Sequence, residues 1–290
     1  MKELVEAAVG QPSGWRALEK VAKESTVKFL PLVAEGGIDF PTFVRCVTFR
    51  FWLVGFLQAD NESLDCKDLS AFLPNDKTRN TLPDEIQQCI PSYAPDVIIP
   101  AYEKLWQSIA AAIVHCGGDD SGLLRHILLD FRDNPTDRQL VTASGINDEP
   151  SVSCIMNEVL RLHPPISQIF RTVHQNWWKS LAIPSVQLAD IKAVQQRDTH
   201  GNLLRDPTRF DPSRWKRDLK PALFAFGGGP HVCPAEKWAP RAAALVASIV
   251  MERVDGVKFR FEYDDSSSAS GCVWDGWSVH KGKRRDNTKS

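Results

Sequence analysis

Apolar residues recur with a helical period over much of the chain before His163. Residues 1–60 are predicted to be helical, with an amphipathic run at 15–29 and a strongly apolar run at 43–57. Residues 97–115 are apolar on most faces of a helix. Because a helix of that kind is normally buried, this run is predicted to cross the interior of the protein.

The pattern changes at Ile166, after which short alternating segments and prolines interrupt the chain. Before that point, further helices are predicted at 123–131 and at 150–163. After it, a helix is predicted from Pro234 to Arg253, and residues 257–263 alternate with the period of a strand. The predicted fold class is therefore mainly α with a small β portion (α+β).

Composition fits a globular protein with a large core. The chain has 290 residues, of which 43% are hydrophobic, and a formal net charge of -1. This balance argues against nucleic acid as the main partner. Residues 1–263 are predicted to form a single domain with a helical front part at 1–96. Residues 60–97 contain loops and short helices, and a mobile loop and a basic tail are expected at 264–290.

The cysteines and the N-terminus bear on the compartment. The chain has 7 cysteines with wide spacings and no C-x-x-C pair, which favours free thiols in a reducing compartment. The first residues lack a basic segment followed by an apolar one, so no signal peptide is expected. The longest uncharged apolar run, at 51–59, is too short for a transmembrane anchor. A cytoplasmic or peripherally attached protein is expected.

Residues 226–235 form a glycine-rich loop that contains a histidine and a cysteine. Gly227, Gly228 and Gly229 allow the backbone to approach a large ligand closely. Cys233 is predicted to precede a helix whose first residue is Pro234, where the helix dipole would favour the thiolate. The simpler interpretation is a glycine-rich loop with a buried cysteine.

Three arginines and one glutamate accompany this loop. Glu158 and Arg161 are three positions apart, so they share one helix face. Such a pair alone is common on protein surfaces and contributes little. Arg214, in a proline-containing meander at residues 207–215, could join them in a buried network, and Arg171 falls on a predicted strand.

Together these elements resemble the cytochrome P450 family of heme-thiolate monooxygenases. The family's heme loop reads F-G-x-G-x-H/R-x-C-x-G, and it is matched at Phe226, Gly227, Gly229, His231 and Cys233. Ala235 stands where glycine is usual. The family's E-x-x-R helix matches Glu158 and Arg161, and its meander arginine matches Arg214. The resemblance implies that residues 97–263 form the heme-binding part of a P450-like fold that lacks part of the N-terminal region.

The resemblance also implies roles for these residues. Cys233 would be the axial thiolate ligand of the heme iron, and Phe226 would pack beside it. His231 and Arg171 would pair with the heme propionates. Glu158, Arg161 and Arg214 would be structural and would hold the meander that presents the loop.

The opposite side of the site departs from the family pattern. The family's central helix carries an acid followed by an alcohol that deliver protons to oxygen, and the matching residues here are Glu103 and Lys104. Glu103 is the candidate catalytic acid, although a solvated carboxylate at a helix start is an equally simple interpretation. Lys104 replaces the alcohol.

The resemblance predicts a monooxygenase that oxidises a small organic molecule, with electrons from NADPH supplied through a separate reductase. Similarity to filamentous-fungal members suggests secondary metabolism. Lys104 motivates an alternative, a heme-dependent isomerase or dehydratase that does not activate oxygen. The short N-terminal region motivates another, a heme-binding remnant without activity.

Overall fold

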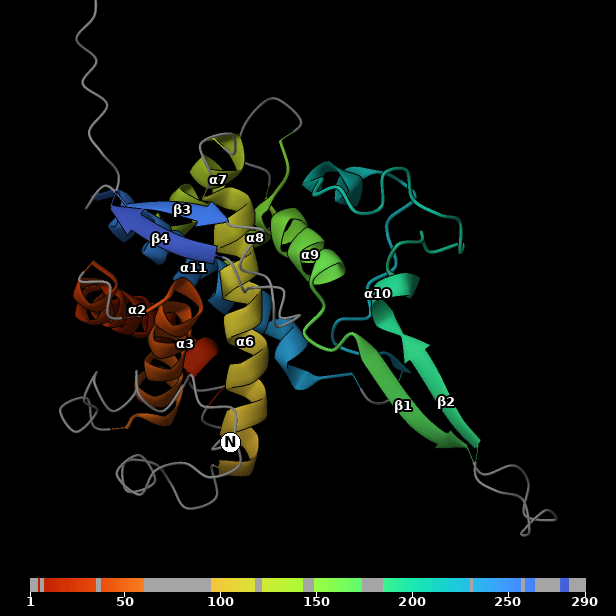
Figure 1. The fold of residues 1–290 in the computed structure, drawn as a ribbon, viewed down its shortest axis with the longest axis horizontal. Helices are drawn as coiled ribbons and strands as arrows, with labels where there is room; N and C mark the ends of the chain where they lie inside the picture. The colour runs from red at the N-terminus through yellow and green to blue at the C-terminus, as the bar shows by residue number, and fades with distance from the viewer. Residues whose placement is uncertain are drawn as a thin grey trace, which may run out of the picture.

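Helices make up most of the structure, and two short antiparallel sheets accompany them in the described part of the chain (Figure 1). This arrangement confirms the predicted mainly helical fold with a small β portion. The computed structural model describes residues 5, 8–34, 38–59, 95–117, 122–142, 149–173, 185–229, 232–256, 259–263 and 277–281. Most of the loop-rich stretch predicted at 60–97, the loop at 264–272 and the tail after 281 lie outside these residues.

The front of the chain forms a helical layer. Helix α2 spans Pro12–Ala34, and α3 spans Phe40–Arg50. The Asp39 side chain caps α3 by accepting a hydrogen bond from the Thr42 backbone N–H at 2.7 Å. The helix continues without a break into a π-helical turn, η1, at Phe51–Phe56. The apolar run predicted at 43–57 is therefore a buried helix, as expected, but its last part has the wider π geometry.

Two long helices form the centre of the protein. Helix α6 spans Pro95–Cys116 and runs through the middle of Figure 1, and α11 spans Ala239–Gly256 and packs against it. Ile109 and Ile113 of α6 and Val246 of α11 are fully buried. The prediction that the apolar helix crosses the interior is confirmed. Helix α7 at Gly122–Asp133 and the short α8 at Asp137–Val141 flank this centre.

Helix α9, the β1–β2 hairpin and α10 lie on the other side of α6, whereas the β3–β4 hairpin contacts α2, α3 and α11 (Figure 1). Helix α9 spans Val152–Leu162 and is capped by the Ser151 hydroxyl, which accepts a hydrogen bond from the Cys154 N–H at 3.3 Å. Strands β1 and β2 pair as an antiparallel hairpin, and β3 and β4 pair as a second one. The bounds are β1 Gln168–Val173, β2 Ser185–Asp190, α10 Ile191–Val194, η5 Pro212–Lys216, η7 Pro234–Lys237, β3 Phe259–Tyr263 and β4 Trp277–Lys281. Strand β3 was predicted, whereas β4 was not.

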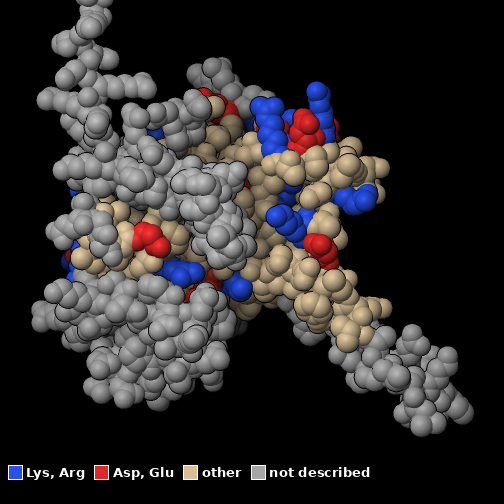
Figure 2. All heavy atoms as spheres, viewed as in Figure 1, with Lys and Arg blue, Asp and Glu red and all other residues tan. Residues whose placement is uncertain are grey.

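The β1–β2 hairpin extends away from the helical body (Figure 1). Phe170 lies opposite Leu188 in the hairpin, and both side chains are exposed, as is that of Val186. Figure 2 shows mainly uncharged surface over this hairpin, whereas Lys, Arg, Asp and Glu are interspersed near the meander. In the described part of the chain, no helix is both long enough and apolar enough to span a bilayer.

Candidate functional site

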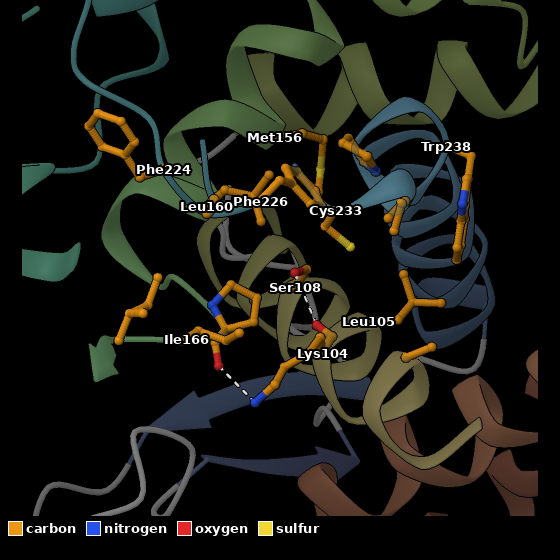
Figure 3. Close-up of a pocket in the computed structure, with 18 residues that line it drawn as sticks. Lys104, Leu105, Ser108, Met156, Leu160, Ile166, Phe224, Phe226, Cys233 and Trp238 are labelled. Carbon is orange, nitrogen blue, oxygen red and sulfur yellow. Dashed lines mark hydrogen bonds between the residues drawn. The ribbon is translucent and has the colours of Figure 1, made fainter. Parts of the chain in front are cut away.

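A cavity of about 470 Å³ lies between α6 and the loop that carries Cys233 (Figure 3). This volume is within the range of small-molecule and cofactor sites. Most of its lining is apolar, with Leu105, Met156, Leu160, Phe226 and Trp238 among the larger side chains. Among the described lining residues, the side chains with polar groups are those of Lys104, Ser108 and Cys233, together with the indole N–H of Trp238.

Cys233 lines the cavity, and its sulfur points into it (Figure 3). The Cys233 N–H donates a hydrogen bond to the Phe226 carbonyl at 2.9 Å, which closes the loop on itself. Gly227 has φ 81° and Gly229 has φ 65°, in the left-handed region that favours glycine. Glycine at these two positions therefore allows the turn that brings Phe226 and Cys233 together. Pro230 and His231 lie outside the described residues.

The helix predicted to begin at Pro234 begins later. Pro234 opens a single 3₁₀ turn, η7, of 4 residues, and the α-helix starts at Ala239. One short turn has few aligned peptide dipoles, so the expected stabilisation of a Cys233 thiolate by a helix dipole loses its basis. Cys233 is also exposed, which corrects the interpretation of the loop as one that contains a buried cysteine.

Cys233 differs from the other described cysteines. Cys46 and Cys116 are buried, and Cys154 is half-buried. Burial raises the pKa of the Cys116 thiol to about 12, although the Arg125 charge opposes the shift. Of the described cysteines, Cys233 alone combines exposure with a position on the cavity wall.

Glu158 lies at the centre of a buried ionic network. The Arg161 guanidinium donates to both carboxylate oxygens, from Nε at 2.8 Å and from Nη2 at 2.7 Å. The Nε atom of Arg214 lies 3.4 Å from Oε1 of the same carboxylate. Glu158 is 0% exposed, Arg161 1% and Arg214 4%. The structure thus brings together the three residues that the sequence pattern linked.

The network extends into the meander. The Trp215 indole N–H and the Asp211 backbone N–H each donate to Glu158 at 3.0 Å. Arg161 Nη1 donates to the Pro207 carbonyl at 2.7 Å. Groups on both sides of the meander therefore converge on one helix face, which fixes the position of the meander relative to α9.

Gln195 connects α9 to the cavity wall, and the sequence analysis missed it. Its amide nitrogen donates to the carbonyls of Leu160 and Arg161 at 3.1 and 2.9 Å. Its amide oxygen accepts from the backbone N–H of Phe224, a cavity-lining residue, at 2.7 Å. Gln195 is 0% exposed, and all of these partners are backbone atoms. A single glutamine without a pattern gave no signal in the sequence.

Arg171 lies on β1, opposite Gln187 of β2. Its backbone position agrees with the predicted strand. Its side chain, like the whole of His231, is outside what the structure describes. The propionate-binding roles predicted for these two residues therefore stay predictions.

One face of α6 lines the cavity. Ala101, Lys104, Leu105 and Ser108 line it, with the spacing of one helix face. Glu103 lies off that face, and its carboxylate accepts a hydrogen bond from the Trp106 indole N–H at 3.5 Å. The structure therefore does not bring Glu103 into the cavity. Ser108, which the sequence analysis missed, places a hydroxyl there one turn after Lys104.

A pair of half-buried histidines lies where α6 meets the end of α9. The Nε2 atoms of His115 and His163 are 2.8 Å apart, and the His115 ring stacks on Phe210 with a centroid distance of 4.1 Å. Burial lowers the pKa of His115 to about 4, although the Glu158 charge opposes the shift. Burial lowers the pKa of His163 to about 3, and His115, Lys192 and Arg161 add to the shift. Both rings are therefore neutral near neutral pH.

The cavity residues fit a flat, mostly apolar cofactor held by a thiolate, as heme would be. One sulfur reaches the cavity from a loop whose backbone turns at Gly227 and Gly229, and the facing helix presents the small side chain of Ala101. A single soft sulfur donor suits heme iron. Cys233 would be the ligand, and the apolar side chains would contact the ring.

The curated relatives of this chain are cytochromes P450. Cytochrome P450 72A15 of Arabidopsis thaliana is 31% identical over 134 residues, which cover 43% of this chain and 25% of that protein. Cytochrome P450 monooxygenase ORF9 of Penicillium roqueforti is 28% identical over 149 residues, or 48% of this chain and 27% of that protein. The matched regions thus span about a quarter of these relatives. No protein-family model matches the chain.

Solved cytochrome P450 structures share the fold over most of the chain. The crystal structure of CYP102L1 has a TM-score of 0.53 and 11% identity, and the match covers 90% of this chain and 75% of that one. Retinoic acid-bound cyanobacterial CYP120A1 has a TM-score of 0.52 and 17% identity, with 91% of this chain and 75% of that one covered. Because plant, fungal and cyanobacterial proteins all match, the expected fungal type is not confirmed. The chain therefore has a cytochrome P450-like fold, and just under half of its sequence is similar to part of these cytochromes P450.

Proposed function

We propose that this protein is a heme-thiolate oxidoreductase that oxidises a small organic molecule, with Cys233 as the axial ligand of the heme iron. The observation that carries the proposal is the Cys233 sulfur on the wall of an apolar cavity, facing α6 (Figure 3). Bound heme would supply the activation of dioxygen, with electrons from NADPH through a separate reductase. Similarity to cytochromes P450 supports this assignment.

The described residues around Cys233 would position the cofactor and exclude water. Phe226 and Trp238 cover the cavity with aromatic surface on the side of the thiol. Glu158, Arg161 and Arg214 would keep the meander in place, and Gln195 would hold Phe224 at the cavity edge. Arg171 and His231 are proposed to bind the heme propionates.

The opposite wall would bind the substrate and hold a proton donor. Ser108 Oγ donates to the Lys104 carbonyl at 3.3 Å and is 6% exposed, so its oxygen is held in a sheltered position on the cavity face. We assign to Ser108 the hydroxyl that the family pattern places at position 104. Proton delivery by Glu103 stays a prediction. Its carboxylate bonds Trp106 and is not part of the described cavity lining.

A labelling experiment tests oxygenation. Heme-loaded protein is incubated with NADPH, a cytochrome P450 reductase and a panel of apolar small molecules under isotopically labelled dioxygen. Mass spectrometry is expected to find a product that has gained one labelled oxygen atom. Cys233→Ala should abolish this product. If fully heme-loaded wild-type protein forms no product, or only products without the label, oxygenation is contradicted.

A second candidate function is a heme-dependent isomerisation or dehydration. Lys104 favours it, because an amine lines the cavity where the family has an alcohol. Turnover without oxygen and without reductant would support this function. Loss of all turnover under strict anaerobiosis would rule it out.

A further inference from the structure

Lys104 is an unusual member of the cavity wall. Among the described residues that line the cavity, it alone carries a charge, and the other polar side-chain groups are a serine hydroxyl, a thiol and an indole N–H. No described Asp or Glu lines the cavity to neutralise it. The Lys104 side chain is exposed, so a ligand that fills this space meets a single positive charge at the solvent edge of a largely apolar cavity.

The ammonium group is held at one edge of the cavity. Lys104 Nζ donates to the Pro165 carbonyl at 3.0 Å, and Pro165 and Ile166 both line the cavity. Figure 3 shows the Lys104 side chain extending away from Cys233 toward this edge. Because an ammonium has three N–H donors, the carbonyl contact orients the group without using all of its hydrogen-bonding capacity.

This arrangement favours an anionic group over a neutral one. Attraction between opposite charges strengthens as water is displaced by apolar surface. A hydrogen bond from an ammonium to a carboxylate is also roughly twice as strong as one between neutral groups. On the α6 side of the cavity, Leu105 and Ser108 would contact an apolar body.

We propose that the substrate is an apolar carboxylic acid whose carboxylate binds Lys104 at the Pro165 edge of the cavity. Its apolar body lies along α6, and a carbon remote from the carboxylate faces the side of Cys233. This proposal rests on the proposed heme-thiolate function and adds the class of substrate to it.

Binding to the heme-loaded protein tests the proposal. A medium-chain fatty acid and the primary alcohol of the same chain length serve as the matched probes, and isothermal calorimetry measures the affinity of each. The wild-type protein should bind the acid about tenfold more tightly than the alcohol, the ratio that one charge-assisted contact supplies. Lys104→Met, which keeps an unbranched side chain but removes the charge, should lose this preference, and Lys104→Arg should keep most of it.

Lys20→Met is the control, because the Lys20 side chain is 78% exposed on α2, and this variant should bind both probes as the wild type does. Equal affinity of the wild type for acid and alcohol, or an unchanged preference in Lys104→Met, would overturn the proposal. A heme propionate is the other carboxylate that Lys104 could bind. If Lys104→Met releases heme faster but still prefers the acid, then Lys104 binds a heme propionate and not the substrate carboxylate.

Heme binding is tested separately from the substrate class. Heme content is measured from the Soret band before any probe is added. Wild-type protein that takes up no heme contradicts the proposed function itself. Protein that is fully loaded but shows no acid preference contradicts only the substrate class.

Discussion

The helical layer that packs against α6 and the segments on the Cys233 side of the cavity are held in place by different forces. In the helical layer of α2 and α3, buried hydroxyls bond within their own helix, as Thr26 does to the Ala22 carbonyl and Thr48 to the Val44 carbonyl. On the Cys233 side, buried polar groups bond between distant segments. Trp215 reaches Glu158 across 57 positions, and Gln195 reaches Leu160 across 35.

This difference determines which substitutions should destabilise each region. Apolar packing fixes α6 among its neighbours through many small contacts, which tolerate modest changes of side chain. The meander depends on a few buried charged groups, and the loss of one partner leaves the others unpaired. The geometry that presents Cys233 should therefore be lost through single polar substitutions.

Removing the charge of Glu158 should have the largest effect. In Glu158→Gln, the buried guanidinium groups of Arg161 and Arg214 lose their common anion, and the expected loss of stability is about 3–5 kcal/mol. Urea unfolding measures it. Asp133→Asn is the matched control, since Asp133 is 69% exposed in its pair with Arg132. The control should cost less than about 1 kcal/mol, and a similar cost for both variants would contradict the contrast between buried and exposed pairs.

Replacing Gln195 should have the next largest effect. Gln195→Glu keeps the oxygen that accepts from Phe224 but places a second oxygen against the carbonyls of Leu160 and Arg161. The loss of these bonds in a buried site should cost about 1–3 kcal/mol and should also lower heme affinity. Urea unfolding and a heme titration measure the two effects. Unchanged heme affinity with lowered stability would show that Gln195 does not position the cavity wall.

A pair of glycines tests the packed side of the comparison. A Cβ atom at Gly55 of η1 would lie 2.7 Å from Leu18 Cδ2, whereas one at Gly122 of α7 would meet nothing within 4 Å. Gly55→Ala should destabilise by about 1–3 kcal/mol, because Leu18 is buried and must move. Gly122→Ala should be neutral or should stabilise by up to about 1 kcal/mol. Thermal unfolding of both variants measures the two effects, and the unfolding temperature should fall in Gly55→Ala but not in Gly122→Ala. An equal change in both would contradict tight packing at Gly55.

The histidine pair joins α6 to the end of α9 and should make stability depend on pH. His115 and His163 have pKa values of about 4 and about 3 in the folded state, below the ordinary value of 6.5. As pH falls below about 6.5, the unfolded chain takes up protons that the folded protein does not, so stability falls by up to about 1.4 kcal/mol per pH unit for each histidine.

Urea unfolding between about pH 7 and about pH 4.5 measures this slope. His115→Gln should flatten it, because one of the two imidazoles with a lowered pKa is removed. His126→Gln should leave it unchanged, since the His126 side chain is 70% exposed in the folded protein. An equally steep slope in His115→Gln would show that other groups cause the acid sensitivity.

Sequence patterns predicted the helices and the Glu158 network for physical reasons. Helix periodicity is a local property, so α6 and α9 were placed close to their observed bounds. The spacing of Glu158 and Arg161 is also local, and the family resemblance supplied Arg214. The three residues that were linked in this way do meet in the structure.

The missed features depend on three-dimensional context. Because α6 is apolar on most faces, its sequence could not reveal that Lys104 rather than Glu103 faces the cavity. The Gln195 side chain bonds only backbone groups in the described contacts, and such a role leaves no spacing to recognise. Helix α11 starts later than predicted because residues from Pro234 form a 3₁₀ turn. Strand β4 is recognised only from its pairing with β3, which the sequence does not show.

The reduced, carbon monoxide-bound absorption spectrum of the purified protein tests the central claim most directly. If Cys233 ligates the heme iron, the wild type and the Cys154→Ser control should show the Soret shift that is characteristic of thiolate ligation, and Cys233→Ala should lose it. The absence of heme from the wild-type protein, or an unchanged thiolate-type spectrum in Cys233→Ala, would contradict the assignment.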